Sequence, residues 1–353
     1  MKKLAFLLAL CLLLSGCGSW MNGSYSSVTP HKIKDQPQEQ SIPSVKNISQ
    51  LKDVLSDLVE QGAETGRFSV EEYHSSALDS SMDMAIAEIL QKHPIGAYAL
   101  EGITYELGTT GGVSAVAVTL TYNRSAEEIR AIQSVTNTEQ AQKRVTEALC
   151  NFDSGVVLRI GQYQELDFSQ TVESFAQANP DQVMEVPQVT VSVYPQDGLD
   201  RVVDVRFSYQ TARDSLRTMR NYVEPVFSSA ALYVSSEEET DSVKYARLYT
   251  FLMERNDYQV NTSITPAYSL LRHGVGDSKA FAMVYAAMCR RAKLDCYLVS
   301  GTRQGSAWFW NIICEDGVYY HVDVLNGNGY VKYADAQMAD YVWDYSAYPA
   351  CGE

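Results

Sequence analysis

The residue types best suited to chemistry lie in one stretch of the 353-residue chain, from His273 to Asp323. Ser278 stands at the start of an expected helix. His321 and Asp323 are two residues apart in an expected strand, so their side chains share one face. A serine hydroxyl becomes a nucleophile only with a general base within reach. If His321 or His273 supplied that base, Ser278 could attack an amide carbonyl.

A helix is expected to carry Ser278. From Phe281 to Met288, apolar residues recur at i, i+3, i+4 and i+7, which predicts one buried helix face. Asp277 or Ser278 would cap the first turn. Upstream, the spacing of apolar residues in 241–258 predicts a second amphipathic helix that leads toward this part of the chain.

Two β-rich runs follow the helix, at 296–301 and 309–324. The second run contains Asp316-Gly317, a dipeptide typical of two-residue hairpin turns. Antiparallel strands beside a helix predict the α+β fold class for this part of the chain.

This order of helix and strands resembles the transglutaminase-like superfamily, whose papain-like core packs a helix on an antiparallel sheet. The resemblance covers about residues 235–343 and is anchored on Cys296, Val299 and Gly301. Further positions that fit the family pattern are Phe281, Tyr285, Leu294, Trp310, Asn311, Gly317, Tyr320 and His321.

Two of the three catalytic positions that the resemblance implies hold other residues. The family's cysteine falls at Ser278, its histidine at Trp308 and its aspartate at Asp323. In the thiol mechanism, the cysteine loses its proton to the histidine, and the carboxylate orients the imidazole. An indole offers one donor and no acceptor, so Trp308 cannot take a proton. We therefore expect a degenerate, inactive domain.

Each position of the degenerate triad also fits a role outside catalysis. Ser278 could cap the helix or lie in its first turn, and Asp323 could accept a hydrogen bond from the backbone or from the Trp308 indole. Trp308 could also bind a ligand in a cleft, since aromatic side chains with a polar group suit peptide or sugar recognition. The competing hypothesis is a Ser278-dependent amide hydrolase or acyltransferase, with His321 as the substitute base.

A lipoprotein signal is expected at residues 1–17. It combines Lys2 and Lys3, an apolar run at 4–14, and the tetrapeptide Leu-Ser-Gly-Cys that ends at Cys17. The run is too short to span a bilayer. The tetrapeptide is similar to a bacterial lipobox, which implies lipidation of Cys17. The chain would then be exported and anchored to the outer face of the cytoplasmic membrane, or on the periplasmic side where a cell has an outer membrane.

The overall composition narrows the class of partner. The formal net charge of −15 argues against nucleic acid. No Gly-rich phosphate loop or other cofactor motif occurs, so no cofactor is expected. Cysteines outside the signal show no metal-ligand spacing, which predicts no metal site. Export would permit a disulfide between two of them, whose pairing the sequence does not specify, and buried free thiols are the default expectation. These cysteines are Cys150, Cys289, Cys296, Cys314 and Cys351.

A tether and two small modules are expected between the signal and the last domain. Residues 18–47 are polar and Pro-containing, which predicts a flexible tether. Segments that end at Ile132 and Met219 both change from strand alternation to helical spacing, with a period near 87 residues. This internal repeat predicts related α+β modules at 48–150 and 151–234, or one pseudo-symmetric domain, unless two amphipathic patterns coincide by chance.

These observations favour a cell-surface lipoprotein whose last domain, 235–353, is a pseudoenzyme that binds a peptide, a cell-wall fragment or a protein. A third hypothesis, besides binding and Ser278 catalysis, is a structural spacer in a surface complex.

Overall fold

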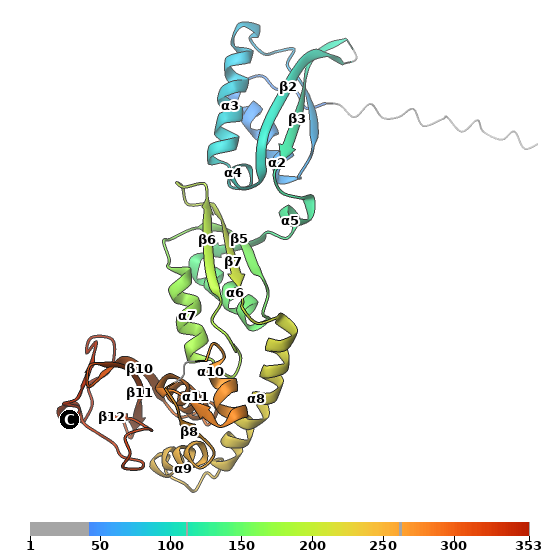
Figure 1. Ribbon diagram of the computed structural model, residues 1–353. Helices are drawn as coiled ribbons and strands as arrows, with labels where there is room; N and C mark the ends of the chain where they lie inside the picture. Colours follow the sequence, from blue (N-terminus) through green and yellow to red (C-terminus); the bar gives the residue numbers. More distant parts are fainter. Residues whose placement is uncertain (1–41, 111, 261–262, 353) are drawn as a thin grey trace, which may run out of the picture. The chain divides into compact units, whose positions relative to one another are not determined.

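The structure, a computed structural model, describes residues 42–110, 112–260 and 263–352 and mixes helices with strands, as the α+β class predicts (Figure 1). The expected signal and residues 18–41 of the expected tether lie outside the described residues. The last residues of that tether are ordered, contrary to expectation, because Val45 is fully buried and Ser44 pairs with Ser69. Among the described helices, none has the length and apolarity needed to cross a membrane.

The first segment packs helices on a three-stranded antiparallel sheet with the order β1-β3-β2. On β3, the alternating residues Val116, Val118 and Leu120 are buried in the core that the helices cover. The elements are α2 (Ile48–Glu60), β1 (Thr65–Ser69), α3 (Leu78–Lys92), α4 (Pro94–Ala99), β2 (Leu100–Thr110), β3 (Val113–Tyr122) and α5 (Ala126–Arg130).

The second segment has a four-stranded sheet with the order β4-β5-β7-β6. The elements are β4 (Gln133–Asn137), α6 (Thr138–Cys150), β5 (Gly155–Gln162), α7 (Phe168–Ala178), β6 (Gln188–Tyr194), β7 (Arg201–Ser208) and α8 (Arg213–Tyr233). β4 pairs in parallel with β5, and Val145 of α6 is buried in the same core. Residues 133–150, which the sequence assigned to the first module, therefore pair and pack with the second sheet.

The two segments share one order of elements. A helix, a strand, a helix, two antiparallel strands and a helix follow one another from α2 to α5 and again from α6 to α8, apart from the short α4. The sheet orders β1-β3-β2 and β5-β7-β6 correspond as well. That both segments derive from one repeated unit stays a prediction.

The C-terminal segment contains the candidate site. Its elements are α9 (Asp241–Met253), β8 (Asp257–Tyr258), α10 (Pro266–His273), β9 (Val275–Gly276), α11 (Ser278–Arg291), β10 (Cys296–Arg303), β11 (Ser306–Glu315), β12 (Val318–Val322) and β13 (Tyr341–Trp343). Strands β10 to β13 form an antiparallel sheet with the order β12-β11-β10-β13. The predicted hairpin is confirmed, since Asp316 and Gly317 both have positive φ between β11 and β12.

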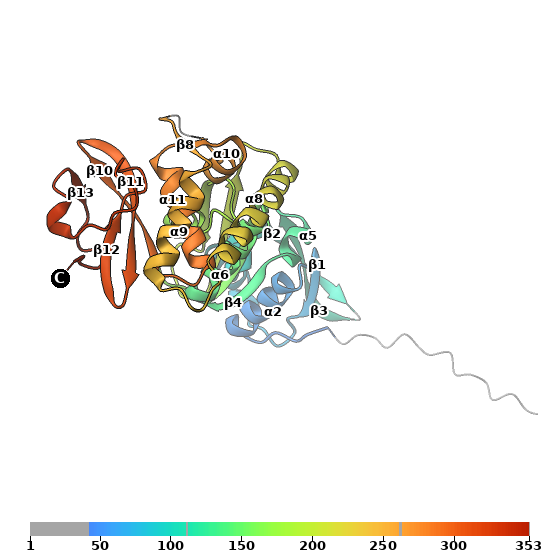
Figure 2. The same ribbon diagram turned by 90° about the horizontal axis from the view of Figure 1, so that it is seen from below.

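Helix α11 lies between the sheet and the other helices of this segment (Figure 2). The predicted apolar face is fully buried, but burial extends around the helix: from Ala280 to Cys289 every side chain is buried. The sequence predicted only one buried face because the alanines at the other positions of the helix are small and do not form a clear second apolar pattern. Such a helix is a central core element rather than an amphipathic surface helix.

Polar contacts fix the helix in register with the sheet. Asn311 of β11 is fully buried and its Nδ2 donates to the Ala282 carbonyl at 2.9 Å. On the other side, the Tyr285 hydroxyl donates to the Tyr245 carbonyl at 3.0 Å. Together these two hydrogen bonds set where the first turn of α11 meets β11.

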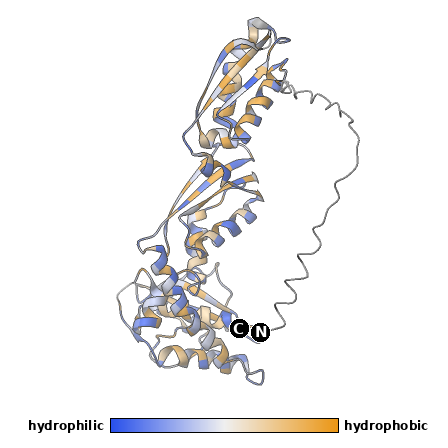
Figure 3. Cartoon of the chain, turned by 90° about the vertical axis from the view of Figure 1, so that its right-hand side faces the viewer, coloured by the Kyte–Doolittle hydropathy of each residue, from blue (hydrophilic) through white to orange (hydrophobic). Residues whose placement is uncertain are grey.

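Hydrophobic and hydrophilic residues alternate along many strands (Figure 3), so each sheet can bury one face.

Candidate functional site

Ser278 opens α11 beside strand β11. Asp277 is the cap, because its side chain accepts from Ala280 N at 2.9 Å, so Ser278 is the first helical residue. The Ser278 side chain is buried, and its Oγ accepts a hydrogen bond from Phe309 N at 3.3 Å. This contact brings Ser278 next to the residue that follows Trp308.

Trp308 and Asp323 form a hydrogen-bonded pair. The indole Nε1 donates to Asp323 Oδ2 at 3.0 Å. The structure thus gathers all three triad positions inferred from the sequence, with Ser278 beside the backbone of β11 and Asp323 at the Nε1 edge of the Trp308 ring. The role expected for Asp323, as acceptor for the indole, agrees with this geometry.

Asp323 is a buried carboxylate held by several donors. Its Oδ2 also accepts from the Tyr341 hydroxyl at 2.6 Å and from Arg303 Nη1 at 3.1 Å, while Leu325 N donates to Oδ1 at 2.9 Å. Burial, together with the hydrogen bond to Asp323, raises the pKa of Tyr341 above its ordinary value. The charge is therefore compensated within the domain and holds three strands together.

The Trp308 ring is half-buried and has polar and aromatic neighbours. The Arg303 guanidinium lies 5.2 Å from the ring centroid, and the Tyr258 ring lies 5.6 Å away. Tyr258 is 43% exposed, so this aromatic pair reaches the surface. Trp308 therefore packs with one edge on Asp323 and takes part in a partly accessible aromatic surface.

His321 cannot serve Ser278 in this arrangement, because both ring nitrogens have other partners. Trp310 Nε1 donates to His321 Nδ1 at 2.9 Å, and Nε2 lies 2.8 Å from Asp335 Oδ1. An indole N–H can only donate, so Nδ1 must be the acceptor and Nε2 must carry the proton. The geometry argues against His321 as the substitute base.

His273, the other candidate base, ends α10 and has different neighbours. Its ring meets the Tyr268 ring edge to face, with centroids 5.7 Å apart. In the part of the chain that the structure describes, no histidine nitrogen is hydrogen-bonded to Ser278. His273 is the last residue of α10, and Gly274 follows with a φ of +73°.

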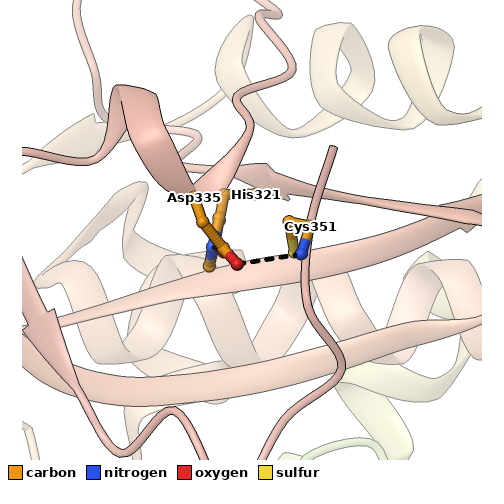
Figure 4. A group of neighbouring side chains, drawn as sticks. All are labelled: His321, Asp335 and Cys351. Carbon is orange, nitrogen blue, oxygen red and sulfur yellow. Dashed lines mark hydrogen bonds and ion pairs between the residues drawn. The ribbon is translucent and has the colours of Figure 1, made fainter. Parts of the chain in front are cut away.

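A second polar cluster lies around His321, where Asp335 and Cys351 approach it (Figure 4). Potential metal-ligand atoms of these three residues lie within 4.8 Å of one another. A zinc-bound histidine would need a lone pair on Nε2 and a proton on Nδ1. The Trp310 donor imposes the opposite tautomer, so this cluster fits a hydrogen-bonded network better than a metal centre.

Cys351 joins this hydrogen-bonded network through its backbone. Its backbone N donates to Asp335 Oδ2 at 3.1 Å, and burial, followed by the nearby Asp335 carboxylate, raises the pKa of the thiol to about 12. The Cys351 thiol is therefore protonated near neutral pH within the network.

Sequence reasoning missed several residues of the site. Arg303, Tyr341 and Tyr258 lie on separate strands and share no motif spacing with Ser278 or Trp308. Asp335 and Cys351 are 14 and 30 residues beyond His321, within a segment with little regular structure. One part of this network could have been expected from the sequence. If Asp323 is buried without a histidine partner, its carboxylate needs other hydrogen-bond donors.

Residues 228–343 match the family model described as the transglutaminase-like superfamily. No curated protein matches the chain.

Among solved structures, a transglutaminase is 10% identical to this chain, with a TM-score of 0.27. The match covers 62% of this chain and 63% of the transglutaminase, so this chain spans less than two thirds of that protein's length. A candidate cysteine protease from Cytophaga hutchinsonii is 15% identical with a TM-score of 0.25, over 44% of this chain and 70% of that one. A candidate protease from Parabacteroides distasonis is 9% identical with a TM-score of 0.24, over 62% and 35%. With TM-scores this low, the three likenesses do not bear on what this chain does.

The buried His321 should make stability depend on pH. Burial lowers its pKa in the folded protein, although Asp335 opposes the shift. The unfolded chain therefore binds more protons as the pH falls below about 6.5, the ordinary histidine value. The stabilisation is complete above that pH and is lost as the pH falls through the folded pKa.

Urea unfolding at a series of pH values checks this prediction. In His321→Asn, the slope of unfolding free energy against pH below neutrality should decrease, by at most about 1.4 kcal/mol per pH unit for one proton. His74→Asn, at an exposed histidine, is the control and should keep the wild-type slope. An unchanged slope in His321→Asn would contradict the assignment.

Proposed function

Because residues 228–343 form a transglutaminase-like domain, we propose that this domain is non-catalytic and that the protein binds a peptide or a cell-wall fragment at the cell surface. One observation carries the proposal: the Trp308 indole donates to Asp323 where the family's mechanism needs a base. Like the family's histidine, Trp308 offers the Asp323 carboxylate an N–H donor on an aromatic ring. Unlike histidine, it cannot accept a proton.

The nucleophile position supports the same proposal. Ser278 Oγ accepts from a backbone N–H, and a serine hydroxyl stays protonated near neutral pH unless a base removes its proton. General-base assistance contributes about 10²- to 10⁴-fold in rate. With that assistance absent and a hydroxyl in place of a thiol, acyl transfer at Ser278 should be negligible.

An activity assay separates this proposal from the Ser278 hydrolase or acyltransferase. Purified full-length protein should incorporate no labelled primary amine into glutamine peptides, and should release no ammonia from them, above the background of Ser278→Ala. Asp277→Ala is the matched control for disturbance of the same helix start, since Asp277 is the cap. Activity that Ser278→Ala abolishes and Asp277→Ala retains would establish the enzyme instead.

The ligand surface proposed here is the aromatic pair of Tyr258 and Trp308. Arg303 lies over the Trp308 ring, which leaves a mixed surface of π faces and donors. Sugar rings and peptide side chains stack on such surfaces while polar groups set their orientation. Asp323 already balances the Arg303 charge, so the surface suits an uncharged ligand group.

Binding to purified peptidoglycan fragments tests this surface. Tyr258→Ala should weaken binding about tenfold or more, because stacking on the accessible ring is lost without any change to the Asp323 contacts. Tyr297→Ala is the control, since Tyr297 is 41% exposed and pairs with Ile312 rather than Trp308. Equal losses in both variants, or no loss in either, would exclude this surface as the ligand site. A protein that binds no fragment at all would fit the structural-spacer hypothesis.

The location at the membrane is part of the same proposal. Lipid attachment at Cys17 would tether the described domains outside the cytoplasm. This attachment is supported by the basic residues, the apolar run and the Leu-Ser-Gly-Cys tetrapeptide within residues 1–17. Cys17→Ser should move the protein from the membrane fraction to the soluble exported fraction and abolish palmitate labelling. Cys150→Ser is the control and should leave both readouts unchanged, because Cys150 packs against the core of the second segment. Membrane retention of Cys17→Ser would disprove the lipid anchor.

A further inference from the structure

A cavity of about 620 Å³ opens between α8 and the C-terminal segment, and neither Ser278 nor Trp308 lines it. It is bounded by α8, by the residues that follow α9, by the C-terminal end of α10 and by α11. Small-molecule sites in proteins have volumes of about 300 to 1,000 Å³ and are mostly apolar with a few placed polar groups. The cavity therefore has the size of a ligand site.

The inner wall of the cavity is apolar. Val226 of α8 and Leu271 of α10 line it, and Met288 of α11, which belongs to the fully buried core, lies behind them. Phe251 contributes an aromatic ring from the end of α9. This wall suits an aliphatic chain.

Two arginines and one histidine complete the lining of the cavity. Arg255, Arg272 and His273 line the cavity, and no aspartate or glutamate lines it among the residues that the structure describes. This is unusual for the chain, which has 43 acidic against 28 basic residues. The local charge is therefore opposite to that of the protein as a whole.

Aromatic groups position the two guanidinium groups. Arg255 lies 4.2 Å from the Phe251 ring centroid and donates to the Phe251 carbonyl at 2.8 Å. Arg272 lies 4.8 Å from the Tyr222 ring centroid and donates to the Tyr222 hydroxyl at 3.4 Å. Within the described ranges, neither forms an ion pair with a carboxylate. Each guanidinium has five N–H donors, so most remain available to a ligand.

We propose that this cavity binds an amphiphilic anion, with an aliphatic chain on the Val226, Leu271 and Phe251 wall and a carboxylate or phosphate head group on Arg255 and Arg272. Guanidinium groups bind both kinds of head group through paired hydrogen bonds. The site is separate from the Tyr258–Trp308 surface, so it does not depend on the proposed function.

Calorimetric titration of the full-length protein with four octyl compounds tests the site. Octanoate and octyl phosphate supply the two anionic head groups, octanol a neutral one and octylammonium a cationic one. At least one of the anions should bind saturably and at least tenfold more tightly than octanol, and octylammonium should bind no better than octanol. The tighter anion identifies the head group. Absence of saturable anion binding, or equal binding of octylammonium, overturns the proposal.

Variants assign the binding to the cavity. Arg255→Gln combined with Arg272→Gln should weaken anion binding at least tenfold and leave octanol binding unchanged. Arg217→Gln is the control, because Arg217 lies on α8, pairs with Asp214 and does not line the cavity. If the double variant unfolds, as judged by its thermal midpoint, the single variant Arg255→Gln replaces it with a threefold loss expected. Wild-type anion affinity in the folded variant would refute the site.

Discussion

The buried carboxylate of Asp323 is the constraint on which the candidate site depends. A charge that is 1% exposed must be compensated by donors. The donors come from the end of β10, from β11 and from β13, through Arg303, Trp308 and Tyr341. An indole N–H meets this need as well as an imidazole N–H does, although it cannot accept a proton. The proposed loss of catalysis is therefore compatible with a fully compensated Asp323 carboxylate.

The direction of one hydrogen bond determines what His321 can do. Trp310 lies in the core and can only donate, so it fixes the proton of His321 on Nε2, facing Asp335. The same constraint disfavours His321 as a base for Ser278 and as a metal ligand beside Cys351. Three acceptable ligand atoms within a few ångströms do not make a metal site when the surrounding donors impose the wrong tautomer.

Sequence pattern predicted the local elements better than their surroundings. The cap of α11 and the Asp316-Gly317 turn follow from residue preferences that act within a few positions. The Trp308–Asp323 pair could be anticipated because the resemblance placed both residues. Arg303, Tyr341 and the partners of His321 could not, because they meet through strand pairing and irregular segments. For the same reason, the spacing of apolar residues could not predict that β4 pairs with β5, because it contains no information on which strands pair.

The two proposed binding surfaces differ in how their arginines are compensated. Arg303 stacks on Trp308 but also forms an ion pair with Asp323, so its charge is largely cancelled before any ligand arrives. Arg255 and Arg272 stack on aromatic rings and are held by a carbonyl and a hydroxyl, which position them without neutralising their charge. In a chain of net charge −15, uncompensated cations beside an apolar wall favour an anion. The Tyr258–Trp308 surface instead favours a neutral group, so the two surfaces should select different ligands.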